Sequence, residues 1–425
     1  MNFVINQKLN VTGLVVIFAM VFHKTTQSPL ERGPVDQLTP LWRQFKKSLM
    51  LSLGTPFNSG RSARMVLAQG KFQKQIDHSV PFPCPLNNTR SQKRPVSVHA
   101  LRPGDIDVIG AMGDSLTAGF GLTATNLLSL LIENRGMSFS GGGQGTWRNF
   151  LTLPNILKEF NPNLYGYALG AYLSTEAGSR LNVAEGSAIS DNMPYMAKVL
   201  VERIKRDRNI NLQQDWKMIT LLIGDNDFCS ELCYKRNFQS VLNKHKQDLL
   251  EVLRTLRDNL PRTFVNILPP VNVAVLKFTY TPSICVITHS VECPCVHGLA
   301  HRASQKKFAN IIRKWQKLDE EIVNLDEFDT EDFTVVYQPF VIDASLPKNE
   351  EGETDLTELS EDCFHQSQKG AARTANNLWN NLLEPVGKKR TNETRLFERF
   401  LCPSAENPFL FTRRNSKLAI QLHNY

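Results

Sequence analysis

The chain has 425 residues, of which 41% are hydrophobic and 21% are charged, an ordinary globular balance that allows a large buried core. Its formal net charge is +8, which suits an anionic lipid surface but is more often a solvated basic face. Nothing in the sequence resembles a nucleic-acid-binding module, so we expect no nucleic-acid partner.

The first 23 residues predict a secretory signal peptide. Lys8 precedes a mostly apolar run over residues 11–22, which is short for a membrane span and suits the core of a signal peptide. No small-residue cleavage site follows, so an uncleaved anchor remains an alternative. We expect a secreted protein with an N-terminal extension over residues 24–104, a main domain over residues 105–390 and a tail over residues 391–425.

The extension contains one amphipathic stretch, residues 41–53, in which Trp42, Phe45, Leu49 and Leu53 recur at helical spacing among basic residues. A helix packed on the main domain is the leading interpretation. A helix docked on a membrane surface is the alternative.

From residue 105 onward, apolar strand-like runs alternate with helical stretches. Such alternation predicts a parallel sheet covered on both faces, so the expected fold is an α/β protein built as a three-layer α/β/α sandwich. The expected strands are 106–112, 180–184, 217–223, 263–268 and 333–336, and the clearest expected helices are 193–208, 238–260 and 305–324.

The first expected strand ends at Gly113, and Asp114 and Ser115 then open a segment that predicts a helix over residues 122–134. In an open α/β sheet, ligands bind beyond the carboxyl ends of the strands, and backbone N–H groups there can stabilise an anion. Ser115 is therefore a candidate nucleophile. A Gly-Asp-Ser sequence alone is weak evidence, because Asp and Ser are ordinary helix-start residues.

Downstream residues offer the partners that a serine nucleophile needs. Asp362 and His365 place a carboxylate and an imidazole three residues apart, as an orienting acid and a general base require. Residues 181–188 can supply backbone N–H groups and Asn226 a side-chain amide. Both are donor types found in oxyanion holes.

These blocks, in this order, resemble the GDSL esterase/lipase superfamily, also called SGNH hydrolases, and within it the phospholipase B-like branch. The resemblance implies a flavodoxin-like sandwich and a serine esterase acting on phospholipids or lysophospholipids at a membrane or micelle surface. It implies no cofactor, no metal and no obligate protein partner. The matching residues are 113–119, 181–194, 223–229 and 362–365, the last running into 378–387.

The resemblance assigns roles residue by residue. Ser115 is the nucleophile, His365 the general base and Asp362 the acid that orients it. The N–H of Ser115, a second N–H and the Asn226 side chain form the oxyanion hole. The second N–H belongs to Gly186 or Ser187, because the family's glycine position falls on Ser187 here and Gly186 stands just before it.

Two questions stay open from the sequence. Asp227 is a less favoured alternative to Asp362 as the acid; we expect it instead to brace its loop by accepting backbone N–H bonds. The alternative functions are an esterase for acetylated sugars or other small esters, and a non-catalytic lipid-binding protein.

Eight cysteines behind a signal peptide predict disulfides, and we expect Cys229–Cys233 on proximity. Within residues 289–301, Cys293 and Cys295 lie close to His297 and His301, whose four-residue spacing suggests zinc. A disulfide-pinned loop is favoured there, because Cys-x-Cys is tight for a ligand loop.

Three further features lie outside the catalytic blocks. The glycine-rich residues 141–145 predict a flexible loop near the mouth of the site, and Trp147 beside them either contacts an acyl chain or packs in the core. Sequons at Asn87 and Asn392 predict glycans away from the site.

Overall fold

The structure is a computed structural model that describes residues 67–274 and 282–423, except 88 and 347, together with residues 44, 47 and 48. The expected signal peptide and most of the amphipathic stretch at 41–53 lie outside the described residues. Within the described part of the chain, no helix is long and apolar enough to cross a membrane.

Within the described residues, four parallel strands form one sheet in the order β1-β2-β3-β4. Almost every strand residue is buried, which explains why these strands read as continuous apolar runs rather than as alternating patterns. Because the strands are parallel, their carboxyl ends share one edge of the sheet. The strands are β1 Ile106–Gly113, β2 Trp216–Leu222, β3 Thr263–Leu268 and β4 Phe333–Tyr337.

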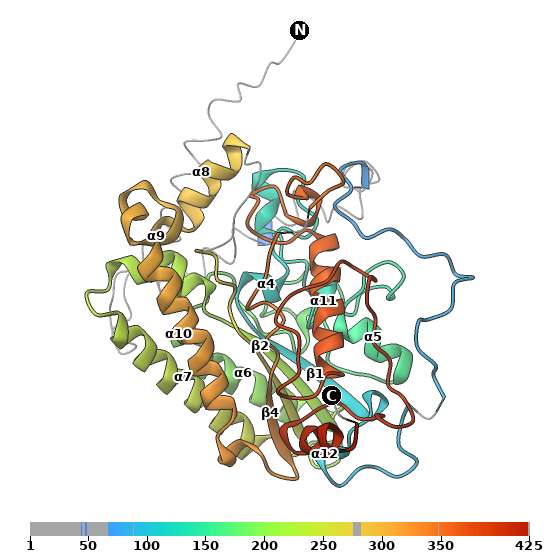
Figure 1. Cartoon of the computed structure of the whole chain (residues 1–425). Helices are drawn as coiled ribbons and strands as arrows, with labels where there is room; N and C mark the ends of the chain where they lie inside the picture. The colour runs from blue at the N-terminus through green and yellow to red at the C-terminus, as the bar shows by residue number, and fades with distance from the viewer. Residues whose placement is uncertain are drawn as a thin grey trace.

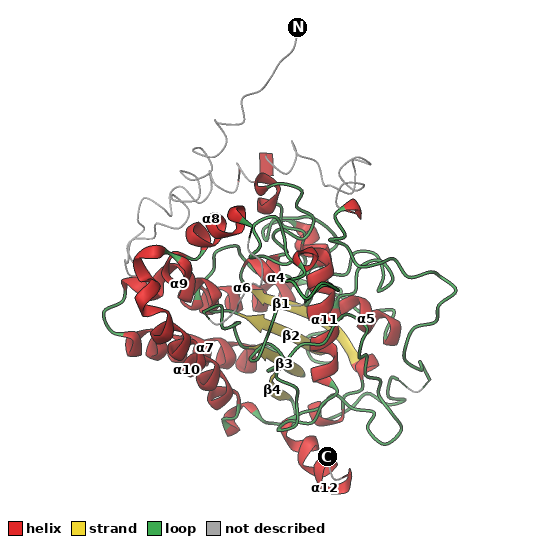
Figure 2. Cartoon of the chain, turned by 45° about the horizontal axis from the view of Figure 1, so that its top comes forward, coloured by secondary structure: helices red, strands yellow, loops and turns green. Residues whose placement is uncertain are grey.

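Helices cover both faces of this sheet (Figures 1 and 2). The three helices predicted most clearly are confirmed as α6 Met193–Arg206, α7 Phe238–Asn259 and α10 Gln305–Val323. The other α-helices of the described residues are α4 Ser115–Ala118, α5 Leu153–Phe160, α8 Ser283–Glu292, α9 Pro294–His297, α11 Gln368–Leu382 and α12 Arg413–His423.

The core divides into two layers because successive strand residues point to opposite faces. On β1, Ile109 packs with the apolar residues of α5 and α11. The preceding residue, Val108, packs with those of α6 and α7 on the other face. The three-layer α/β/α sandwich expected from the sequence is confirmed.

Two local predictions are wrong. Residues 180–184 form no regular strand: they touch the edge of β1 only through an isolated bridge, Asn182 with Ala111, because a 3-10 turn precedes them and Arg180 has φ of 45°. Residues 122–134 form no α-helix but only a 3-10 turn, Leu127–Leu131, after Gly119 and Gly121 break the chain direction with positive φ.

All eight cysteines form disulfides: Cys84–Cys402, Cys229–Cys293, Cys233–Cys295 and Cys285–Cys363. The predicted Cys229–Cys233 pair is wrong, because both cysteines lie on the turns after β2 and each bonds across to one cysteine of the Cys293-Pro294-Cys295 motif. The predicted disulfide-pinned loop around that motif is confirmed. Such pairing is typical of an oxidising compartment.

The glycine-rich segment is packed rather than flexible. A Cβ at Gly141 would lie 2.8 Å from the Cβ of Ala111, and one at Gly143 would lie 2.1 Å from the Tyr167 ring. Trp147 is buried with Phe82 and does not line the cavity described below. The glycines at 141 and 143 therefore serve close packing, and Trp147 belongs to the core.

Candidate active site

The carboxyl end of β1 presents Ser115. Gly113 ends the strand with φ of 148°, and a Cβ there would lie 2.4 Å from the Leu222 carbonyl oxygen, so only glycine fits this turn. Asp114 caps the following helical turn by accepting a hydrogen bond from the N–H of Leu116 at 3.0 Å. This turn places Ser115 at the shared edge of the sheet.

His365 reaches Ser115 from a turn that precedes α11. Its Nε2 lies 2.9 Å from Oγ of Ser115, although 250 positions separate the two residues. Its Nδ1 lies 2.5 Å from Oδ2 of Asp362. The other carboxylate oxygen of Asp362 accepts hydrogen bonds from the backbone N–H groups of Phe364 and His365, both at 3.0 Å.

The charges of Asp362 and His365 stabilise each other. Burial disfavours the charged carboxylate of Asp362, but His365 and the donated hydrogen bonds outweigh that effect and lower the pKa of Asp362. Burial also disfavours the charged imidazole, yet the Asp362 carboxylate raises the pKa of His365 above its usual 6.5. A proton taken from Ser115 would therefore be stabilised on His365.

Asn226 and Asp227 follow β2 but point to different surroundings. Asn226 lines the same cavity as Ser115 and donates one amide hydrogen to the Ala188 carbonyl at 2.9 Å. Since an amide nitrogen carries two hydrogens, a second remains. Asp227 does not line this cavity; it accepts the backbone N–H of Ser190 at 3.1 and 3.2 Å.

Gly186 and Ser187 lie in a turn that is hydrogen-bonded to the turn carrying Ser115, since the N–H of Glu185 donates to the Gly113 carbonyl at 3.1 Å. A Cβ at Gly186 would lie 2.4 Å from the ring of Phe120. That ring in turn stacks on His365 with 6.1 Å between centroids. The turn with Gly186 is thus brought close to the imidazole of His365 through the ring of Phe120. Ser187, in the same turn, has φ of 63°.

The cavity holds about 140 Å³. It contains groups that the sequence analysis missed, above all Asp225, which stands beside Asp114. Burial raises the pKa of Asp114 to about 6. Burial and the neighbouring Asp114 charge raise the pKa of Asp225 well above its usual value. Asp225 could not be singled out because an aspartate before Asn-Asp is typical of any turn.

The sequence of this chain is similar to that of a known protein family and of known relatives. The GDSL-like lipase/acylhydrolase family profile matches residues 109–378. Membrane-associated phospholipase B1 from Homo sapiens is 41% identical over 335 residues, covering 77% of this chain and 22% of the relative. Its Rattus norvegicus counterpart is 40% identical, covering 78% of this chain and 23% of the relative. The chain therefore spans less than a quarter of these relatives.

Among solved structures, phospholipase A1 from Streptomyces albidoflavus NA297 superposes with a TM-score of 0.31 and 14% identity, covering 63% of this chain and 95% of that one. That similarity is too low to support an inference. The family profile alone covers more than half of the chain and includes the positions of Ser115, Asn226, Asp362 and His365. The chain belongs to the GDSL-like lipase/acylhydrolase family of ester hydrolases, in the phospholipase B-like branch.

Proposed function

We propose that the chain is a secreted serine esterase that hydrolyses fatty-acyl esters of phospholipids and lysophospholipids. The observation that carries the proposal is the hydrogen-bond chain from Ser115 through His365 to Asp362, which opens into a cavity. The names of the phospholipase B1 relatives support the phospholipid class.

In the first half of the reaction, Oγ of Ser115 attacks the ester carbonyl while Nε2 of His365 accepts its proton. The N–H of Ser115, the N–H of Gly186 or Ser187, and the free amide hydrogen of Asn226 stabilise the oxyanion. His365 then gives its proton to the alcohol that leaves, and the acyl group stays on Ser115.

In the second half, His365 removes a proton from water, and the resulting nucleophile attacks the acyl-enzyme. The same donors stabilise the second oxyanion. Ser115 regains its proton from His365 and the fatty acid leaves. Asp362 holds the imidazole tautomer and balances its charge during both halves.

The walls of the cavity suit an acyl ester better than a small polar one. Leu116, Val271, Val273 and Leu346 line it as apolar side chains, and Phe364 lies next to the catalytic imidazole. Apolar walls with a few polar groups that fix orientation are typical of sites for lipid-like ligands.

The direct test combines covalent labelling with a panel of substrates. A fluorophosphonate probe should label the wild type at Ser115, and Ser115→Ala should lose both labelling and hydrolysis. The panel is phosphatidylcholine, lysophosphatidylcholine, triacylglycerol and p-nitrophenyl acetate, with release of fatty acid from the first two expected.

Ser190→Ala is a matched control, because Ser190 also bonds to a histidine but does not line the cavity; it should keep labelling at Ser115. Labelling that persists in Ser115→Ala would end the assignment. Cleavage of p-nitrophenyl acetate without phosphatidylcholine would instead indicate a small-ester esterase.

A further inference from the structure

One face of α8 packs against the turn that carries Asp362. Its buried residues recur at helical spacing: Cys285, Thr288, His289 and Glu292. Cys285 is disulfide-bonded to Cys363. The hydroxyl of Thr288 donates to the Asp362 carbonyl at 2.7 Å, and Nε2 of His289 lies 2.9 Å from the Cys363 carbonyl.

The last residue of this face, Glu292, reaches the acid itself. One carboxyl oxygen of Glu292, one of Asp362 and one ring nitrogen of His365 all lie within 4.8 Å of one another. Glu292 is 5% exposed and Asp362 is 0% exposed. Two buried carboxyl groups this close can share a hydrogen bond only if one of them carries a proton.

The surroundings decide which carboxyl carries it. Asp362 accepts hydrogen bonds from two backbone N–H groups and lies against the imidazole of His365, all of which stabilise its charge. Among the ion pairs of the described residues, none involves Glu292. Burial and the Asp362 charge raise the pKa of Glu292 well above its usual value, since two adjacent buried carboxylates cannot both ionise.

We propose that Glu292 is a positioning residue for the triad: as a neutral carboxylic acid it donates a hydrogen bond to Asp362, extending the chain to Ser115–His365–Asp362–Glu292. This inference rests on the proposed function. The donated bond fixes the carboxylate and spreads its negative charge, so Asp362 holds a protonated His365 less tightly and His365 returns its proton more readily.

Several other titratable groups face this cluster, and they set the background for any pH profile. His289 on α8 and His297 on α9 line the same cavity, and burial lowers the pKa of both, that of His297 to about 4. The charge of Asp114, the N-cap residue of α4, also raises the pKa of His365. None of these groups is among the causes that raise the pKa of Glu292, which are burial and Asp362.

The test compares Glu292→Gln with Glu292→Ala by measuring kcat and KM across pH. Glutamine keeps a neutral donor of similar shape, so its kcat and the acid limb of its kcat/KM profile should match the wild type. Alanine removes the donor and concentrates charge on Asp362. Its kcat should fall by about 10-fold to 100-fold with KM unchanged, and the acid limb should move to higher pH.

Thr288→Val is the structural control, because it removes a hydrogen bond to the Asp362 backbone without changing charge beside the carboxylate. It should lower the melting temperature and leave the acid limb in place. The inference fails if Glu292→Gln loses as much activity as Glu292→Ala, or if the acid limb of Glu292→Ala stays at the wild-type pH.

Two measurements complete the test. A difference infrared spectrum, wild type minus Glu292→Gln, should show a protonated carboxyl band at neutral pH, and carboxylate bands instead would overturn the inference even if the alanine variant does not fold. Activity should be unchanged by EDTA or added Mg²⁺; a response lost in Glu292→Gln would make Glu292 a metal ligand instead. Wild-type hydrolysis and its loss in Ser115→Ala test the proposed function separately.

Discussion

At the scale of single residues, hydrogen-bond geometry alone does not define a hydrolase site. A second Ser-His-Asp chain runs through the core: Oγ of Ser190 lies 2.8 Å from Nδ1 of His245, whose Nε2 lies 2.6 Å from Asp319. All three residues are buried and none lines the cavity. Ser115 differs by standing beyond the end of a strand, where a substrate can reach it.

The two candidate acids give a prediction at this scale. Losing the orienting carboxylate of a triad lowers kcat by about 10⁴-fold, so Asp362→Asn should lose nearly all activity while remaining folded. Asp227 instead holds the N–H of Ser190, so Asp227→Asn should mainly lower stability. The measurement is kcat at matched folded concentration, with urea midpoints for both variants. Full loss in Asp227→Asn with activity retained in Asp362→Asn would reverse the assignment.

At the scale of elements, the turn with Gly186 determines how much room the imidazole has. A Cβ at Gly186 would lie 2.4 Å from Cζ of Phe120, whose ring stacks on His365. Gly186→Ala should therefore push Phe120 toward the imidazole and lower kcat by about 10²-fold, the effect of a misplacement of about 1 Å. Stability should change less, because the turn is at the edge of the core.

Gly170→Ala is the matched control for this prediction, since a Cβ there meets no atom closer than 3.3 Å. Steady-state kinetics on a soluble ester compare the two variants. Equal activity in both would show that Phe120 moves aside freely and that the turn does not position His365.

The sequence predicted elements where local pattern sets local structure. Buried parallel strands appear in the sequence as apolar runs, and the long helices appear as amphipathic patterns. The pair Asp362 and His365 was predictable because a three-residue spacing lies within one turn. The helix expected at 122–134 does not form, because Gly119 and Gly121, at φ of 80° and 72°, end the turn after Ser115.

Features that depend on segments far apart in the chain could not be predicted. Cys229 and Cys233 looked like partners by proximity, but α8 and α9 bring Cys293 and Cys295 against them. Glu292 has no local signal at all, because its importance lies in a contact with a residue 70 positions later in the sequence. Sequence spacing reports neighbours within an element and not the packing between elements.

At the scale of the whole molecule, the segments near the two ends of the described residues complete one face of the sandwich. Val98, Leu101 and Leu410 belong to the same core cluster as α5 and α11. The disulfide Cys84–Cys402 joins the two segments, and the N–H of Leu410 donates to the Leu101 carbonyl at 2.8 Å. Packing is therefore continuous across the boundaries expected at residues 104 and 390.

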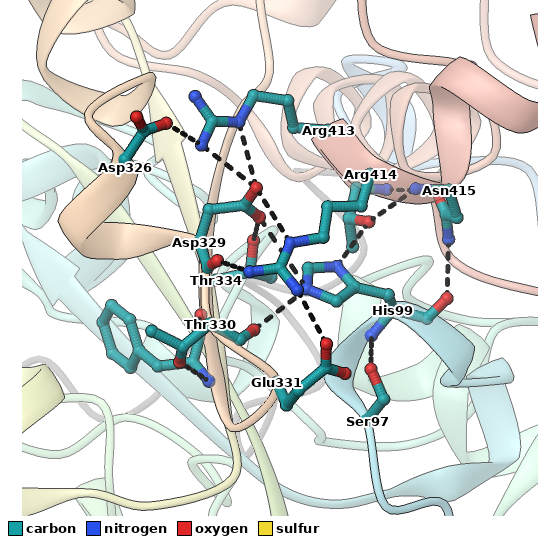
Figure 3. Close-up of polar contacts among 12 residues, drawn as sticks. Ser97, His99, Asp326, Asp329, Thr330, Glu331, Thr334, Arg413, Arg414 and Asn415 are labelled. Carbon is teal, nitrogen blue, oxygen red and sulfur yellow. Dashed lines mark hydrogen bonds and ion pairs between the residues drawn. The ribbon is translucent and has the colours of Figure 1, made fainter.

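The polar cluster in Figure 3 connects α12 and His99 to the segment that precedes β4. Asp329, just before β4, is 8% exposed and accepts hydrogen bonds from Nε of Arg413 at 3.1 Å and Nε of Arg414 at 3.2 Å. The ring nitrogen Nε2 of His99 lies 3.8 Å from the same carboxylate. One buried carboxylate thus holds α12 against the start of the last strand.

Asp329→Asn should lower the free energy of unfolding by about 2 kcal/mol. Breaking a buried ion pair costs about 3–5 kcal/mol, and the partial exposure of Arg413 and Arg414 reduces that cost through solvent screening. Asp326→Asn is the matched control: Asp326 bonds the same Arg413, but its side chain is 98% exposed, so its loss should cost under about 0.5 kcal/mol. Urea unfolding measures both.

Neither variant should change kcat at matched folded concentration. Asp329 precedes the amino end of β4, whereas Ser115 follows the carboxyl end of the parallel β1, at the opposite edge of the sheet. A fall in kcat, or equal destabilisation by the two variants, would contradict this account.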